Sequence, residues 1–587
     1  MSYGQTEISY GQTEMSYGQT EIIASSLEST AWEMCASLIR AAYSPNVKER
    51  ADCSTVICDA EGRTLALATH GPAHLGAALR LVPAILKRFP LETLAAGDMF
   101  FANDPYIVGV THLNDCTLAA PIFVGNQVVA FAAAIAHHSD VGGRVPGSES
   151  GDATSIFQEG IRVPPVKLFA KGVLRDDVLE MFLLNSRTPY FSEGDVYAQR
   201  AAVIRGIQRI QETYARYGAG VMSTAIADML DGTERRIRHC ILNNLQDGVY
   251  EAVDWLDEDG INDDPVKLAV TITIAKDEIQ FDFSNCSPQL GTGKNIPYTH
   301  TMATVYYCLK AMADPALSIN EGMYRPIQVI APPGSIVNPL APAGVSSRNL
   351  TSMILADVMI DALSQAIPSR GIAAGGPYQG IILGGWDPLR NRFFVDYENF
   401  AGGHGANVLH DGLDVAQLHM TNTANLPIEV MELEFPVRVE RYEIIVDSGG
   451  AGRLRGGCGV NRELRMLTNQ TSLTVRSARQ RFAAPGKDGG HAGSTGAFYV
   501  NPKDIDDQKL RSTFSEMALA EGDLLRILTP GGGGMGDPKL RAPEEVATDV
   551  REGKISHTNA REIYGVVLDE INGMIDLKQT ELLRSRV

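Results

Sequence analysis

Two apolar runs, TLAAPIFV and QVVAFAAAIA, occupy positions 117–124 and 127–136 of the chain. Both have the composition of β-strands, and the Gly125-Asn126 dipeptide between them favours a tight reversal of the chain. We therefore predict an antiparallel hairpin. Its pairing would place His137, which follows the second run, beside His112 and Asp115, which precede the first.

Helical periodicity marks three other parts of the chain. Residues 26–42 predict an amphipathic helix, because four apolar side chains return on one face, namely Leu27, Met34, Cys35 and Leu38. Ser25 and Glu28 have the spacing of a capping box at its start. Residues 175–227 predict longer helices that form core and interface, and short helices are expected from residue 542 onward.

Imidazole and carboxylate groups gather around the predicted hairpin. His112 and Asp115 precede it, and His137, His138 and Asp140 follow it. A single buried histidine is most often a hydrogen-bonded core residue. The chain has only 12 histidines in 587 residues, so three of them together with carboxylates indicate a metal or catalytic site.

The remaining pattern predicts an α+β fold: a multi-domain, mixed chain with antiparallel β-rich regions and a helical C-terminal tail. STVICDA and TLALATH flank a turn at Glu61-Gly62, KLAVTITIA and EIQFDFSN read as strands, and a helix should follow Thr299. The predicted regions are residues 1–21, a repeated and disordered arm; 22–246, a metal-site domain with helices; 247–424, an α+β middle domain; 425–540, a glycine-rich β region; and 541–587, the helical tail.

The arm consists of three near-identical heptapeptides, MSYGQTE, ISYGQTE and MSYGQTE. Each repeat carries a glycine and too few apolar residues for the seam of a coiled coil, so a disordered arm or a duplicated start is favoured. No function is assigned to it.

Composition excludes several classes of protein. A hydrophobic content of 44% can fill more than one core, whereas a net charge of −19 argues against binding to nucleic acid or to an anionic membrane. The longest apolar run is too short to cross a bilayer, and no signal sequence opens the chain, so a cytoplasmic location is expected. The eight cysteines show no CxxC spacing and are expected to be reduced and structural.

Two long motifs resemble the hydantoinase B/oxoprolinase family: NDPYIVGVTHLND from Asn103 to Asp115, and AFAAAIAHHSDVGG from Ala130 to Gly143. Weaker matches extend the resemblance over most of the chain after residue 21. Relatives in this family include ATP-dependent lactam and hydantoin hydrolases and the acetone and acetophenone carboxylases. Membership would imply a related activity.

The resemblance also implies a metal site. Asp52, in the segment KERADCS, matches a family carboxylate, although read alone it suits a turn or a cap equally well. Asp52, His112, Asp115 and His137 would then bind a divalent metal, with zinc the first choice and manganese the second. His138 and Asp140 would be catalytic residues that orient a ligand or pass protons, and whether His137 or His138 is the ligand stays open. His70 and His74 suit either the same pocket or a loop.

No GxxxxGK[ST] phosphate loop and no GxSxG elbow occurs in the sequence. The resemblance implies that ATP is bound by a separate A-type subunit, which phosphorylates the substrate, in a hetero-oligomer such as (αβ)2. The predicted reaction is ATP-dependent ring opening of a small cyclic amide, such as hydantoin, 5-oxoproline or a lactam, by metal-activated water. The alternatives are a subunit of an acetone-type carboxylase and a non-catalytic structural subunit.

Overall fold

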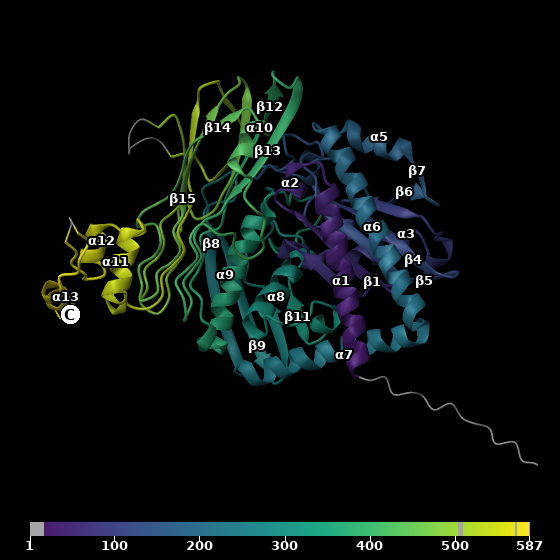
Figure 1. The fold of residues 1–587 in the computed structure, drawn as a ribbon, viewed down its shortest axis with the longest axis horizontal. Helices are drawn as coiled ribbons and strands as arrows, with labels where there is room; N and C mark the ends of the chain where they lie inside the picture. The colour runs from purple at the N-terminus through teal and green to yellow at the C-terminus, as the bar shows by residue number, and fades with distance from the viewer. Residues whose placement is uncertain (1–16, 503–508, 570–571, 586–587) are drawn as a thin grey trace, which may run out of the picture.

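The computed structural model describes residues 17–502, 509–569 and 572–585 (Figure 1). Residues 1–16 of the predicted arm lie outside the described residues, and residues 17–21 open helix α1 (Tyr17–Ala41). The capping box predicted at Ser25 is therefore wrong, because Ser25 lies inside the helix. The helix begins earlier since Thr20 and Ile23 continue the buried stripe, while the predicted face from Leu27 to Leu38 is buried as expected.

A seven-stranded sheet forms the centre of the N-terminal half, in the order β2-β1-β5-β4-β3-β6-β7. Its strands are β1 (Cys53–Asp59), β2 (Thr64–Thr69), β3 (Met99–Ala102), β4 (Asp115–Val124), β5 (Gln127–His137), β6 (Val166–Ala170) and β7 (Val173–Leu174). The predicted hairpin is confirmed: β4 and β5 pair antiparallel, with Asp115 directly opposite His137.

Both faces of this sheet are buried. Ala132 and Ala134 of β5 share a hydrophobic core with Met34 of α1 and with α6 (Pro189–Tyr217), and α1 lies along α6 in Figure 1. Phe131 and Ile135, which alternate with these alanines, join a second core on the opposite face. Other helices of this half are α2 (Pro45–Lys48), α3 (Ala78–Arg88), α4 (Pro105–Val108), α5 (Asp176–Leu184) and α7 (Ala219–Asn244).

The second core belongs to the middle of the chain. A four-stranded sheet has the order β11-β10-β9-β8, with β8 (Gly248–Leu256), β9 (Val266–Ala275), β10 (Glu278–Asp282) and β11 (Ile327–Ile330). Helices α8 (Tyr298–Ala313) and α9 (Arg348–Ala366) pack between this sheet and the seven-stranded one. Nearly every residue of α9 is buried, as expected for a helix enclosed on all sides.

Two further four-stranded sheets share one core and form a β-sandwich. One contains β12 (Gln379–Asp387), β13 (Arg392–Phe400), β16 (Thr471–Arg476) and β18 (Thr513–Leu519); the other contains β14 (Val437–Ile444), β15 (Val460–Met466), β17 (Ala497–Val500) and β19 (Leu524–Leu528). Helix α10 (Ile428–Glu434) packs beside β14. The sandwich takes β12 and β13 from residues predicted to belong to the α+β middle domain and its other strands from the predicted glycine-rich β region.

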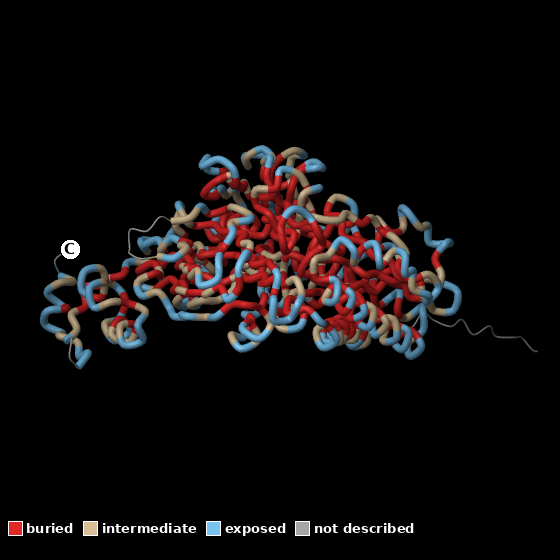
Figure 2. The backbone as a smooth tube through the Cα atoms, turned by 90° about the horizontal axis from the view of Figure 1, so that it is seen from above, coloured by how far each residue is buried: buried red, intermediate tan, exposed pale blue. Residues whose placement is uncertain are grey.

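Extended glycine-rich segments run from the sandwich toward the C-terminal helices (Figure 1). They pack backbone against backbone: a Cβ atom on Gly532 would lie 1.9 Å from the carbonyl oxygen of His404. The chain ends in α11 (Pro543–Arg551), α12 (His557–Glu562) and α13 (Leu577–Arg584), as predicted, and these helices have a small core of their own. Figure 2 shows buried backbone running through the body of the molecule. The mixed α and β fold class is confirmed.

Candidate metal centre

The hairpin brings the predicted site residues to one end of the seven-stranded sheet. Asp115 is the first residue of β4 and His137 the last of β5, and their side chains share one face because the two residues are paired. Asp52 stands immediately before β1, where its carbonyl oxygen accepts a hydrogen bond of 3.1 Å from the backbone N–H of His137. Three segments far apart in sequence therefore meet at this edge.

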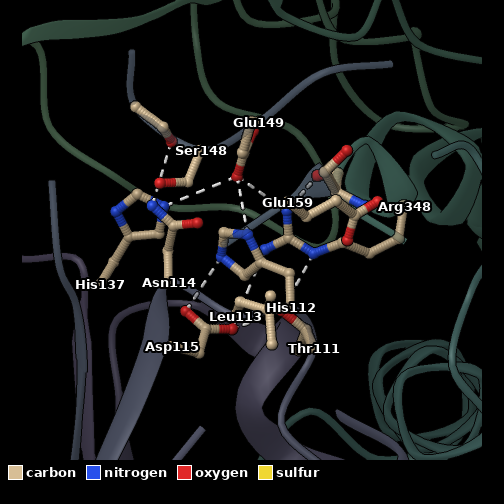
Figure 3. A network of polar contacts seen from close by, with 12 residues as sticks. Thr111, His112, Leu113, Asn114, Asp115, His137, Ser148, Glu149, Glu159 and Arg348 are labelled. Atoms are coloured by element: carbon tan, nitrogen blue, oxygen red, sulfur yellow. Dashed lines mark hydrogen bonds and ion pairs between the residues drawn. The ribbon is translucent and has the colours of Figure 1, made fainter. Parts of the chain in front are cut away.

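His112 lies between two carboxylates (Figure 3). Its Nε2 is 3.3 Å from Oδ1 of Asp115, and its Nδ1 is 2.9 Å from Oε1 of Glu149. The rings of His112 and His137 stack with their centroids 4.9 Å apart. His112, His137 and Glu149 each offer a ligand atom within 4.8 Å of the other two.

A small buried cavity adjoins these groups. Its lining includes Asp52, His74, Asp115 and His137, and its volume of about 20 Å³ has room for one water molecule or one ion. His74 approaches Asp115 at 3.4 Å through Nε2 and contacts the hydroxyl of Ser54 at 2.7 Å through Nδ1. Two carboxylates and two imidazoles thus surround a space the size of a single atom or molecule.

The residues present fit a divalent metal. Within the described parts of the chain, Nε2 of His137 and Oδ1 of Asp115 make no hydrogen bond although both are buried. Buried polar atoms are normally satisfied, so such atoms facing a cavity point to a missing partner. Imidazole and carboxylate donors together suit zinc or manganese.

A family model described as hydantoinase B/oxoprolinase matches residues 18–538. The chain belongs to this family. The B-type component of a putative D-/L-hydantoinase from Pseudomonas sp. (strain NS671) is 30% identical over 96% of this chain and 97% of its own length. The beta component of the caprolactamase from Pseudomonas jessenii is 31% identical over 96% and 98%.

Solved structures agree with this assignment to the hydantoinase B/oxoprolinase family. The crystal structure of the ATP-dependent caprolactamase from Pseudomonas jessenii superposes with a TM-score of 0.88 and 28% identity, covering 97% of this chain and all of that one (100%). A nucleotide-free acetone carboxylase has a TM-score of 0.89 at 20% identity, covering 97% of this chain and 83% of that one, which shows a shared fold alone. None of the described helices is long and apolar enough to cross a membrane.

Charged side chains of both signs meet at the buried centre of this family member. Glu149 is wholly buried and contacts Arg476, the hydroxyl of Tyr397 at 3.2 Å and Arg348 at 3.1 Å. Burial alone would raise the pKa of Glu149, but Arg476 and His112 hold it well below its ordinary value. The carboxylates of Glu149 and Asp115 thus lie among two guanidinium groups and the imidazoles of the centre.

Asp115 is a buried carboxylate whose neighbours prepare it to receive a cation. Its side chain is 1% exposed, and burial by itself would raise its pKa. The nearby imidazoles of His112 and His74 outweigh that effect and hold the pKa of Asp115 well below its usual range. The group is therefore ionised at neutral pH, as a metal ligand must be.

The structure does not bring His138 and Asp140 into the cavity. His138 points toward α6, where its Nε2 is 3.1 Å from Oε1 of Gln199. The carboxylate of Asp140 accepts hydrogen bonds from the backbone N–H groups of Gly142, Gly147 and Arg187 and therefore holds a loop together. Their role in proton transfer stays a prediction, while the contacts of both are those of residues that support the fold.

Several polar residues at the centre were missed by sequence reasoning. The sequence did not decide whether His74 lies in the pocket or in a loop, and in the structure His74 lines the cavity. The ring of His70 instead packs against Trp32. Glu149 lies six residues after Gly143, the end of the second family motif, and this proximity was the available signal. Arg348, Tyr397 and Arg476 come from α9, β13 and β16, and nothing in their local sequence separates them from surface residues.

Proposed function

We propose that this chain is the B-type subunit of an ATP-dependent cyclic amide hydrolase. It would open the ring of hydantoin, 5-oxoproline or a lactam after an A-type partner has bound ATP and phosphorylated the substrate. The names of the hydantoinase and caprolactamase relatives support the reaction class. The observation that carries the proposal is the buried cavity between Asp52, Asp115 and His137, with donor atoms that lack a hydrogen-bond partner among the described residues.

The proposed metal ligands are Asp52, His112, Asp115 and His137, with Zn²⁺ preferred and Mn²⁺ second. A divalent ion held there would supply Lewis acidity at neutral pH and lower the pKa of water. The chain itself supplies a dry site: His112, Asp115 and His137 are each no more than 2% exposed, which strengthens every electrostatic interaction at the centre.

Arg348 places a guanidinium group beside the proposed metal site. It lines the cavity from the N-terminal end of α9 and is held by Thr111 at 3.0 Å and Glu149 at 3.1 Å. A divalent ion bound there would add positive charge beside this guanidinium group. That charge would attract an anionic, phosphorylated intermediate more strongly than a neutral cyclic amide.

The test is coexpression with an A-type subunit, purification of the complex, metal analysis, and assays on caprolactam, 5-oxoproline and hydantoin with and without ATP. His112→Ala should abolish ATP-dependent ring opening while the complex still assembles. Full activity in that variant would instead favour the non-catalytic, structural alternative.

The carboxylase alternative is tested in the same preparation. ATP-dependent turnover of a ketone that requires bicarbonate, without any ring opening, would replace the hydrolase proposal. Its present support is the fold shared with acetone carboxylase.

A further inference from the structure

Both ring nitrogens of His112 lie close to carboxylates but make no hydrogen bond within the described residues, and this raises the question of which nitrogen carries the proton. Nδ1 lies 2.9 Å from Glu149 and Nε2 lies 3.3 Å from Asp115. A neutral imidazole has one N–H and one lone pair, and an ionised carboxylate can only accept. One of the two carboxylates must therefore face the lone pair, and that side is the one on which a cation can bind.

Glu149 is fixed more firmly than Asp115. Arg476 of β16 and Tyr397 of β13 both donate to its Oε2, while Arg348 of α9 donates to Oε1. An arginine remains protonated in proteins, so these contacts keep Glu149 an acceptor. Three elements distant in sequence from the hairpin thus hold one carboxylate in place against His112; Figure 3 shows Glu149 with His112 and Arg348.

The cavity lies on the side of Asp115. Asp115 belongs to the cavity lining, whereas His112 and Glu149 do not. A cation beside Asp115 would lie nearer to Nε2 of His112, which is 3.3 Å from Oδ1 of Asp115, than to Nδ1, which is 2.9 Å from Oε1 of Glu149.

We propose that Glu149 is a positioning residue of the metal centre: it accepts the Nδ1 proton of His112 and so directs the Nε2 lone pair toward the cation beside Asp115. The inference rests on the proposed metal site and adds to it the residue that selects the histidine tautomer. Carboxylate acceptors behind metal-binding histidines are a recurrent means of fixing ring orientation and tautomer.

Glu149→Gln tests this because the replacement has the same shape. The amide oxygen of the glutamine would accept from Arg476 and Tyr397, which leaves its NH2 group facing His112 and also Arg348, whose hydrogen bond to Oε1 would be lost. That NH2 would donate to Nδ1, place the ring proton on Nε2 and oppose cation binding. Glu159→Gln is the matched control: this second buried glutamate accepts from the backbone N–H groups of Val345 and Ser346 instead of an imidazole.

The measurement is the Kd of Zn²⁺ and of Co²⁺ for the purified complex after removal of metal, by competition with a chromophoric chelator. The expected result for Glu149→Gln is a Kd about 10- to 100-fold higher with an unchanged Co²⁺ absorption spectrum. Glu159→Gln should keep the wild-type Kd. Glu149→Asp, which retains the charge, should fall between wild type and Glu149→Gln and serves as the second variant if the glutamine protein does not fold.

Three results would overturn the inference. One is a wild-type Kd in Glu149→Gln; another is an equal loss in Glu149→Asp and Glu149→Gln; the third is a changed Co²⁺ spectrum, which would make Glu149 a direct ligand. A wild-type complex that binds no stoichiometric metal would instead refute the proposed metal centre, so the two failures are distinguishable.

Discussion

Glu159 offers a direct test of the electrostatics beside the site, because it is a buried carboxylate without a cationic partner in any described contact. Its Oε1 accepts from the backbone N–H groups of Val345 at 2.7 Å and Ser346 at 3.0 Å, and its Oε2 makes no hydrogen bond within the described residues. Burial raises the pKa of Glu159 to about 8, against the opposing effect of those N–H groups. Glu159→Gln imitates the protonated acid without titrating.

The sign of the effect follows from the proton count. The pKa of Glu159 is about 8 in the folded protein and 4.5 in the unfolded chain. Between these values the folded state keeps a proton that the unfolded state has lost, so the free energy of unfolding falls as pH rises. The loss is about 1.4 kcal/mol per pH unit and amounts to about 5 kcal/mol at pH 8.

Urea unfolding of wild type and Glu159→Gln at a series of pH values measures this difference. The two proteins should be equally stable near about pH 4.5, and the glutamine variant should gain steadily up to about pH 8, beyond which the difference stays constant. Parallel stability curves across that range would show that Glu159 ionises normally, and the reasoning from burial would then be wrong.

Three other perturbations have expected outcomes. Arg476→Met leaves Glu149 buried without its nearest cation and should lower the free energy of unfolding by about 3–5 kcal/mol, with a smaller loss in Arg476→Lys; equal stability of all three proteins contradicts this. Gly532→Ala forces a Cβ atom within 1.9 Å of a backbone carbonyl and should prevent stable folding, whereas Gly291→Ala, which meets nothing within 4 Å, should change stability by less than about 0.5 kcal/mol. Zn²⁺ at about 100 times its Kd should raise the free energy of unfolding by about 2.7 kcal/mol, and a chelator should reverse the gain; no shift would mean no specific site.

The features that the sequence predicted correctly are those with a local cause. The β4–β5 hairpin follows from two β-rich runs around Gly125-Asn126, and its pairing places Asp115 opposite His137. The buried stripe of α1 follows from helical spacing in the same way. The start of α1 was predicted wrongly because Ser25 has the chemistry of a cap, while burial of Thr20 and Ile23 extends the helix past it.

The part of the centre that the sequence did not predict, namely the contacts of Glu149, has no local cause. Glu149 meets Arg348, Tyr397 and Arg476, which lie 199, 248 and 327 residues further along the chain. An arginine that pairs with a buried carboxylate has the same sequence surroundings as an arginine on the surface. Its partner is decided by how α9 and the sandwich pack around the residues that follow the hairpin, and a single sequence does not specify that packing.

One extra residue in β5 decides which of the adjacent residues His137 and His138 faces the cavity. Next to the turn, Phe123 pairs with Val128, but Ile122 pairs with Ala130, so Val129 forms a bulge. Without this bulge every later pair would shift by one position, and Ala136 would stand opposite Asp115. Because a shift of one residue exchanges the faces of a strand, the bulge is what brings His137 to the cavity and leaves His138 facing α6. The sequence His137-His138 alone does not show which imidazole faces the cavity. The register that decides it is set at the Ile122–Ala130 pair, seven residues before His137 in β5.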